Sequence, residues 1–233
     1  MKRVLIIATA MILAACSTMR RPVPQQELSS QKQIAVVSTL GNQFHGIHVG
    51  VTVFGNSNYE AVVSDWKIDE KTEQFLVKAI NRPDSRSAFP LAHDAELGTR
   101  LEASKTFTSG FDYKEITEIA KSQGADTVLI VQGIRYENAP FYQPGYGFYS
   151  ASGGLNKKTS CVYSLFTLSA YSTITGAQLG WEWGFPACNG DAGDVPYRSA
   201  FEDFTADEKE LLEKKVELSI QANLKRALEI LGY

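Results

Sequence analysis

The chain has 233 residues, of which 44% are hydrophobic, 11% are aromatic and 21% are charged. This composition is typical of a folded globular protein and excludes a disordered chain, a collagen-like chain and a polytopic membrane protein. A formal net charge of −3 gives no electrostatic footprint for nucleic acid, and three cysteines are too few for a disulfide-built miniprotein.

The first sixteen residues carry an export signal. Residues 1–3 are a basic start, residues 4–15 are an apolar run, and Cys16 follows. The run is too short to span a bilayer, which takes about 20 apolar residues, and it has the organisation of a secretory signal. Its ending, residues 13–16 (LAAC), resembles the bacterial lipobox. That resemblance implies a signal peptide over residues 1–15, acylation of Cys16 (palmitate among the chains) and, with Ser17 next, a periplasm-facing outer-membrane lipoprotein. A plain secretion signal with an incidental cysteine is the alternative.

Residues 16–32 are predicted to be a lipidated flexible tether. The segment is polar, contains two prolines and shows no apolar periodicity. Removal of residues 1–15 takes away Lys2 and Arg3, which lowers the net charge from −3 to −5. A mildly acidic surface predicts attachment to an anionic membrane through the lipid alone, without a basic patch. Residues 33–233 contain no linker or repeat and are predicted to form a single domain.

The first half of this domain predicts alternating strands and helices. A buried strand is expected at 33–39, and a hairpin is expected from strands at 47–53 and 59–64 around a turn at 55–58. A short strand at 87–91 and a central strand at 127–131 follow. Helices are expected to begin at Asp69, at Asp94 and at a capping box over 112–115. In the first hairpin, the side chains expected to share one buried face are Ile47, Val49, Val51 and Val53.

The second half predicts another hairpin and a long helix. The hairpin spans 160–187, and the helix begins at the capping box Thr205-x-x-Glu208 and ends at Gly232. Hairpin registers in which paired residue numbers sum to 349 or 351 both join two apolar faces. Those faces are Phe166, Leu168 and Ala170 on one strand and Leu179, Trp181, Trp183 and Phe185 on the other. The fold class is therefore α/β (α+β): a mixed β-sheet flanked by helices, with a β-hairpin and a long C-terminal helix.

Two short motifs resemble a recurrent pattern of envelope lipoproteins. One is Gly124-Ala125-Asp126 leading into an apolar strand, and the other is a hairpin reading Tyr163 … Thr175-Gly176 … Trp181. Over residues 33–185 the chain is similar to the domain of the curli-secretion lipoprotein CsgG, the amino-terminal domain of TolB and the penicillin-binding-protein activator LpoB. The resemblance implies fold more than function. The hairpin at 46–64 and a long aromatic loop depart from the pattern, so no functional residue is carried over.

The remaining cysteines predict a disulfide between Cys161 and Cys188, because an even pair in an exported protein is usually oxidised. In the 349 register they face each other, and in the 351 register they are diagonal; two free buried thiols are the alternative. No metal site or cofactor is expected. His45-x-x-His48 lies on a predicted strand, where residues three apart point to opposite faces.

The segment 136–158 is the strongest sequence candidate for a functional surface. It is long for a connection and places six aromatic residues within 14 positions, with two prolines restraining the backbone. Large amphipathic rings suit recognition. Alternatives are that the loop folds back over the sheet or contacts a membrane surface. The predicted partner-binding residues are Phe141, Tyr142, Tyr146, Phe148 and Tyr149.

These features predict a non-catalytic envelope lipoprotein that binds, or helps to assemble, another envelope component such as a protein or peptidoglycan. The sequence has no nucleophile elbow, phosphate loop or dinucleotide fingerprint. One alternative is a subunit of a lipoprotein secretion or pore assembly. The other is an envelope hydrolase acting on glycan or peptide.

Overall fold

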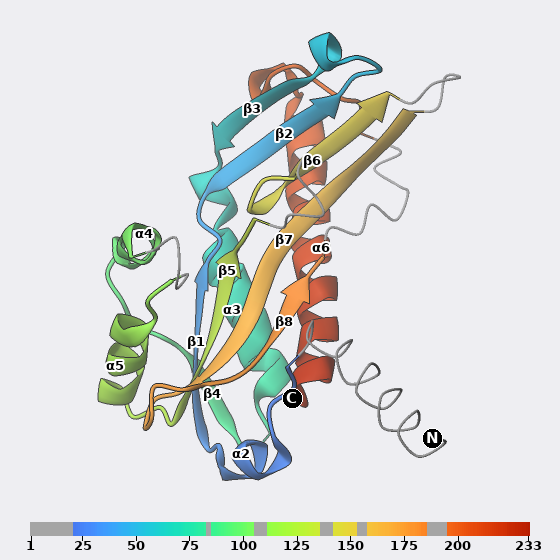
Figure 1. Ribbon diagram of the computed structural model, residues 1–233. Coiled ribbons are helices and arrows are strands. Elements are labelled where there is room, and N and C mark those ends of the chain that lie inside the picture. The colour runs from blue at the N-terminus through green and yellow to red at the C-terminus, as the bar shows by residue number, and fades with distance from the viewer. Residues whose placement is uncertain (1–20, 83–84, 105–110, 136–141, 153–157, 186–194) are drawn as a thin grey trace, which may run out of the picture.

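The computed structural model describes residues 21–82, 85–104, 111–135, 142–152, 158–185 and 195–233. One mixed eight-stranded sheet has the order β3-β2-β6-β7-β5-β1-β4, and β8 pairs with β7 (Figure 1). This architecture confirms the predicted α+β class, including the long C-terminal helix. The helices are α2 (Gln25–Ser30), α3 (Ile68–Ile80), α4 (Leu97–Ala103), α5 (Lys114–Ser122) and α6 (Ala206–Leu231). The strands are β1 (Gln33–Thr39), β2 (Gln43–Val49), β3 (Ser57–Val62), β4 (Ser87–Pro90), β5 (Thr127–Gly133), β6 (Gly145–Ser152), β7 (Lys158–Ser172) and β8 (Gln178–Gly184).

Strand β7 joins the two halves of the sheet. Its first part, 158–165, pairs with β6, and its second part, 166–172, pairs with β5 and β8. β1 runs parallel to β4 and β5, and β2 runs parallel to β6. The β2–β3 hairpin lies at the upper end of Figure 1, whereas α2 and the start of β4 lie at the lower end. The molecule therefore has two distinct ends.

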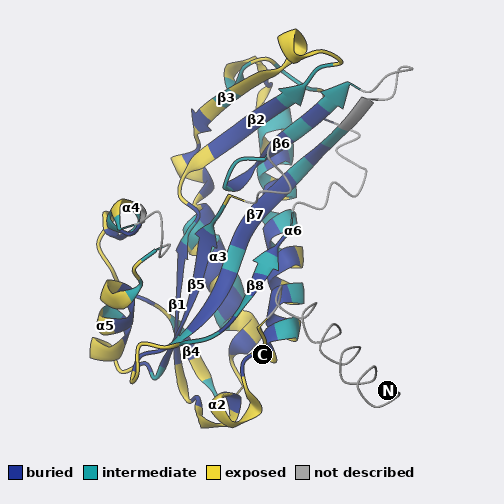
Figure 2. Cartoon of the chain, viewed as in Figure 1, coloured by how far each residue is buried: buried dark blue, intermediate teal, exposed yellow. Residues whose placement is uncertain are grey.

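Helices cover the sheet on both sides. α3 and α6 pack on one face, where their side chains meet Ile34, Val36, Leu129 and Phe166. α4 and α5 pack on the other face, over alternate residues of β1 and β5. Figure 2 shows the buried strands between these layers. β5 is buried at six of its seven positions, as expected of a central strand.

Helix α6 follows its local sequence signals closely. Thr205 is the N-cap, and the Thr205 hydroxyl and the Glu208 carboxylate form the predicted capping box. Gly232 ends the helix at φ 96°, a left-handed conformation that glycine adopts without strain. One stripe of the helix is buried against the sheet: Leu212, Val216, Ile220, Leu224, Ala227 and Leu231.

The predicted tether is wrong for residues 21–32, because this segment packs on the domain. The backbone N–H and carbonyl of Arg21 bond to Trp181 at 3.2 and 2.9 Å. Val23 and Leu28 are 4% and 3% exposed, and Leu28 belongs to helix α2. Val23 and Leu28 are too few to show an apolar period in the sequence, yet both are buried in the core. The domain thus begins at or before residue 21, and residues 1–20 lie outside the described part.

The prediction of a long loop over 136–158 is wrong for residues 145–152, and residues 136–141 and 153–157 lie outside the described part. Strand β6 occupies 145–152 and pairs with both β2 and β7. Its glycine- and serine-rich composition gives a weak strand signal, and pairing on both sides compensates for that weakness. In the first hairpin, β2 begins at Gln43 and ends at Val49, so the strand lies earlier than predicted.

The predicted register of the β7–β8 hairpin is wrong by one residue. Phe166 pairs with Gly184 and Leu168 pairs with Glu182, so the paired numbers sum to 350 before a bulge at Ala170/Tyr171. A slip of one residue reverses the faces of a strand. The side chain of Glu182 therefore lies on the α6 side with 0% exposure, whereas Trp181 and Trp183 are partly exposed on the opposite side.

Candidate functional site

The tip of the β2–β3 hairpin, residues 50–56 (the hairpin tip), exposes an unusual group of apolar side chains. Val51, Val53 and Phe54 are 72%, 76% and 96% exposed. Among the described residues, the other large hydrophobics that are well exposed are Val62, Ile174 and Leu218. Single exposed hydrophobics are normal, whereas a cluster of them marks an interaction site.

The conformation of the hairpin tip is fixed by backbone hydrogen bonds. The N–H of Gly50 donates to the Asn56 side-chain oxygen at 2.9 Å, and the N–H of Gly55 donates to the Thr52 carbonyl at 2.9 Å. A Cβ on Gly50 would lie 2.6 Å from the backbone of Gly55, so the close approach requires glycine. The exposed side chains are thus held outward by a built turn.

A hollow of about 260 Å³ lies beside the hairpin tip. Its walls come from residues 47–49 of β2, residues 56–58 and Gln143. Tyr197 supports one side, since its ring stacks on His48 at 4.6 Å and its hydroxyl bonds the Ser57 hydroxyl at 2.6 Å. Residues 49–59 contain no Asp, Glu, Lys or Arg, and the other described residues that line the hollow are Ile47, His48 and Gln143. The described part of the tip and hollow is therefore apolar or polar, with His48 as its one titratable side chain of acid or base type.

The structure separates the predicted partner-binding aromatics into two groups. Tyr146 and Phe148 are 0% exposed in the main core, so their prediction as contact residues is wrong. Tyr142 and Tyr149 are partly exposed and stack at 4.7 Å, and burial raises the pKa of Tyr142 to about 12. Phe141 lies outside the described residues. Alternation along β6 explains the split, because neighbouring side chains of a strand point to opposite faces.

The tyrosine pair is continuous with the hollow. The ring of Tyr142 contacts Tyr163 edge-on at 4.8 Å, and the N–H of Gln143 donates to the Tyr163 hydroxyl at 3.3 Å. Ile47 belongs to this aromatic cluster and also lines the hollow. We call the hairpin tip, the hollow, Tyr142 and Tyr149 the distal surface.

Sequence reasoning missed the hairpin tip because it placed Val51 and Val53 on a buried strand face. Alternating valines are the usual signal of such a face. The available counter-signal was the pair of glycines at 50 and 55, which bracket the apolar residues and favour a turn.

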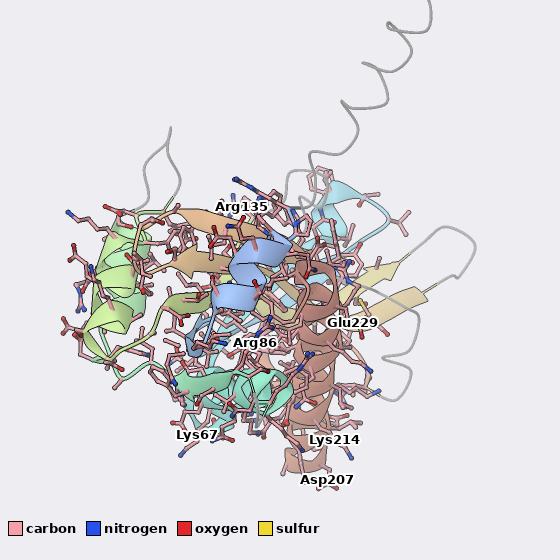
Figure 3. The ribbon with its side chains drawn as sticks, turned by 90° about the horizontal axis from the view of Figure 1, so that it is seen from below. Lys67, Arg86, Arg135, Asp207, Lys214 and Glu229 are labelled. Atoms are coloured by element: carbon pink, nitrogen blue, oxygen red, sulfur yellow. The ribbon has the colours of Figure 1, made fainter. Side chains whose placement is uncertain are left out.

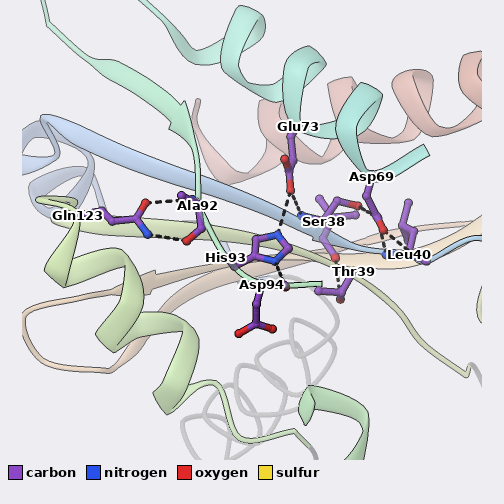
Figure 4. A network of polar contacts seen from close by, with 11 residues as sticks. Ser38, Thr39, Leu40, Asp69, Glu73, Ala92, His93, Asp94 and Gln123 are labelled. Carbon is purple, nitrogen blue, oxygen red and sulfur yellow. Dashed lines mark hydrogen bonds and ion pairs between the residues drawn. The ribbon is translucent and has the colours of Figure 1, made fainter. Parts of the chain in front are cut away.

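A second cluster of polar side chains lies where β1 ends beside α3 (Figure 4). The Ser38 hydroxyl donates to Asp69 at 2.5 Å, and Asp69 also accepts the N–H groups of Leu40 and Gly41. Glu73 accepts the N–H of Ser38 at 3.0 Å. Asp69 was predicted to cap its own helix, but it instead holds the chain that leaves β1.

The same cluster contains a serine, a histidine and carboxylates, the residue types of a catalytic triad, but they are arranged differently. Such a triad needs serine bonded to histidine. Here Ser38 donates to a carboxylate, while the Nε2 of His93 lies 4.0 Å from Glu73 and its Nδ1 lies 2.8 Å from the Asp94 carbonyl. As bonded, the cluster ties β1, α3 and the chain after β4 together.

Glu73 predicts a pH dependence of stability. Burial raises its pKa to about 7, above the value near 4.5 of an exposed carboxyl, against the opposing effect of the Ser38 N–H. The folded protein then holds a proton that the unfolded chain releases, so stability present below pH 4.5 is lost as pH rises to about 7. Burial also raises the pKa of Asp69, which adds a contribution of the same sign. This contribution is the same in the wild type and in a variant at position 73.

Glu73→Gln should therefore gain stability relative to the wild type between pH 5 and pH 8, by on the order of 2 kcal/mol. Urea unfolding at four pH values in this range measures the gain. Glu70→Gln makes the same change on an exposed side chain of α3 and should show no such gain. Equal profiles for wild type and Glu73→Gln would contradict the prediction.

The structure describes some of the remaining predicted site residues. His45 contacts Glu60 at 3.4 Å while His48 contacts Tyr197 and Ser150, so the two histidines diverge as predicted. No group of three potential metal-ligating side chains occurs within the described ranges. Cys161 is 3% exposed and disulfide-bonded. Cys188 and Cys16 lie outside the described residues, so the Cys161–Cys188 pairing and the lipidation stay predictions.

Comparisons with known proteins add no relative. No protein-family model, no curated protein and no solved structure matches the chain. Within the part that the structure describes, no helix combines the length and apolar character needed to cross a membrane. The fold and the geometry of the distal surface are therefore the basis for a functional conclusion.

Proposed function

We propose that the chain is a non-catalytic outer-membrane lipoprotein, anchored through Cys16 and facing the periplasm, that docks another envelope protein through the distal surface. The exposure of Val51, Val53 and Phe54 on a hydrogen-bonded turn is the observation that carries this proposal. Keeping these side chains in water is unfavourable by about 25 cal/mol for each Å² of apolar area, and burial against a partner removes that penalty.

The position of the distal surface supports the same role. Residue 21 and helix α2 belong to the lower half of the molecule, whereas the β2–β3 hairpin is at the upper end (Figure 1). A lipid on Cys16 would hold the lower end toward the membrane and present the hairpin tip away from it. The polar groups of residues 56–58 around the hollow would supply uncharged hydrogen bonds to the partner. The resemblance to envelope lipoproteins over residues 33–185 stays a prediction.

Site-specific crosslinking tests the docking surface. A photo-reactive side chain at position 54 should capture a defined envelope protein in intact cells, and one at position 174 should not. Val51→Ser/Phe54→Ser should reduce the yield of this adduct, with the probe placed at position 53, by tenfold or more. Ile174→Ser/Leu218→Ser removes two other exposed apolar side chains, far from the tip in sequence, and should leave the yield unchanged. Equal capture from positions 54 and 174 would count against docking at the tip.

The anchor has its own test. Cys16→Ser removes the acylation site, so the protein should move from a membrane fraction that resists salt to one that salt releases. Several acyl chains bind stably, whereas peripheral electrostatic attachment is screened by salt. The measurement is fractionation before and after a wash with about 0.5 M salt, which screens surface charges. Salt-resistant attachment of the variant would show that another element anchors the chain.

A further inference from the structure

A basic pocket lies at the lower end of the domain, the end opposite the distal surface. It has a volume of about 530 Å³ and lies where β1 and β4 begin and α3 ends. Of the seven described residues that line it, Lys32, Arg82 and Arg86 are cationic, and none of these seven is acidic. Figure 3, which views the molecule from below, shows Arg86 beside helix α2. The structure thus concentrates positive charge locally on a chain whose overall charge is negative.

Two of the three cations are available to a ligand. Lys32 and Arg82 are exposed, and neither side chain forms an ion pair with a described residue. The Oδ2 atom of the nearby Asp126 carboxylate accepts the backbone N–H groups of Lys32 and Gln33, at 2.7 and 3.0 Å, whereas its Oδ1 atom is buried without a hydrogen-bond partner in the described residues. The pocket also presents serine and asparagine side chains, which are suited to donate hydrogen bonds to phosphate oxygens.

Arg86 differs from the other two because it is built into the structure. One nitrogen, Nη2, donates to the Leu28 carbonyl of α2 at 2.8 Å, and the guanidinium lies over the Tyr233 ring at 5.4 Å. The other nitrogen, Nη1, is buried and has no hydrogen-bond partner in the described residues. Helix α2 therefore holds the charge of Arg86 beside the pocket. This helix lies in the segment that was predicted to be a flexible tether.

The anchor places this pocket near a membrane. Residue 21 is bonded to β8, so at most the five steps from Cys16 to Arg21 separate the acylation site from the folded domain. Even fully extended, a chain of this length spans only about 17 Å. This step rests on the proposed lipidation of Cys16. Under it, Arg21 and the part of β8 that it pairs with stay within about 17 Å of the acylated cysteine, which turns the lower half of the domain toward the leaflet.

We propose that the pocket formed by Lys32, Arg82 and Arg86 binds the phosphate of an anionic phospholipid headgroup, and that this contact orients the anchored domain with its hairpin tip away from the membrane. Arginine presents a planar fork that matches phosphate oxygens, and lysine adds a point charge. Anionic lipid attracts each nearby cation with an energy that corresponds to about a fivefold change in binding. The overall acidity of the surface does not oppose a local contact, because charges beyond about 10 Å are screened by salt.

Vesicle flotation of the full chain carrying Cys16→Ser tests the pocket without the anchor. This protein should float with vesicles of phosphatidylethanolamine and phosphatidylglycerol and should not float with phosphatidylcholine vesicles. Adding Lys32→Gln/Arg82→Gln should weaken binding about 25-fold, from about fivefold for each charge. Arg86 is left intact because it also holds α2 in place.

The matched control is Lys67→Gln/Lys214→Gln, which also removes two positive charges. Lys67 directly precedes α3, and Lys214 is exposed on α6. It should leave vesicle binding within about twofold. Equal binding to neutral and anionic vesicles, or an equal loss in the control, would overturn the proposal. Release from vesicles by millimolar inorganic phosphate would also overturn it, because the pocket would then be a free-phosphate site. The test can fail while the wild type is still anchored in a salt-resistant way, so its failure is distinguishable from a failure of the proposed function.

Discussion

Replacing Phe148 with alanine is expected to lower the free energy of unfolding by about 3–5 kcal/mol, as for other large aromatic side chains removed from a core. Phe148 is 0% exposed, and its ring lies 6.4 Å from Tyr197 and 6.5 Å from Phe204 between ring centres. Truncation would leave a cavity between β6 and the chain that leads into α6. Because β6 is hydrogen-bonded to β2 and β7 on its two edges, it cannot readily move to fill the cavity. Chemical denaturation monitored by tryptophan fluorescence measures the loss.

Tyr149→Ala is the matched control, since the two residues are neighbours on β6 and face opposite sides of the sheet. Tyr149 is partly exposed and loses mainly its stacking with Tyr142, which is worth about 0.5–1.5 kcal/mol beyond its buried area. Partner capture at position 54 should also be weaker in Tyr149→Ala if the tyrosine pair belongs to the distal surface. A Phe148→Ala protein that is as stable as Tyr149→Ala would contradict the placement of β6 in the sheet.

Replacing Arg226 with alanine is expected to cost about 3–5 kcal/mol, because it removes a cation from beside a buried carboxylate. The Nη1 of Arg226 lies 3.5 Å from Glu182, whose side chain is 0% exposed. Its Nη2 also donates to the Trp183 carbonyl, so the same side chain joins α6 to β8 twice. Urea unfolding of the single variants and the double variant measures this coupling.

Glu182→Gln supplies the control for this prediction. With the charge of residue 182 removed, Arg226→Ala should cost less, because the buried side chain then carries no charge for Arg226 to offset. A recovery of at least about 1.5 kcal/mol in the double variant relative to additivity is expected. Additive losses would mean that Arg226 acts only through Trp183, and would contradict the ion pair.

The elements that sequence predicted well are those whose signals are local. β1 has the predicted bounds, and α6 begins at the capping box of Thr205 and ends at Gly232. Helix caps, turn glycines and consecutive apolar residues act within a few positions of the chain. Their effect on the backbone is therefore present in the sequence before any tertiary contact forms.

The candidate site was predicted less well because its residues depend on which face is covered. Phe148 and Tyr149 are adjacent aromatics, yet one is in the core and the other is beside the distal surface. Trp181 and Trp183 are more apolar than Glu182, yet Glu182 is the residue that faces α6. Hydrophobicity alone cannot choose between the faces of a strand when each carries some apolar residues. The cation of Arg226, distant in sequence, offsets the burial of a charge on the α6 side.

By itself the sequence determined the class of fold, the order of most strands and helices, and the expectation of an exported, acylated chain. Tertiary structure decided which aromatic rings are available, how short the connection to Cys16 is, and where three cations meet. The physical reason is that caps and periodicity are properties of neighbouring residues. Exposure and electrostatic potential instead sum over segments such as residues 32, 82 and 86, which only the folded sheet brings to one end.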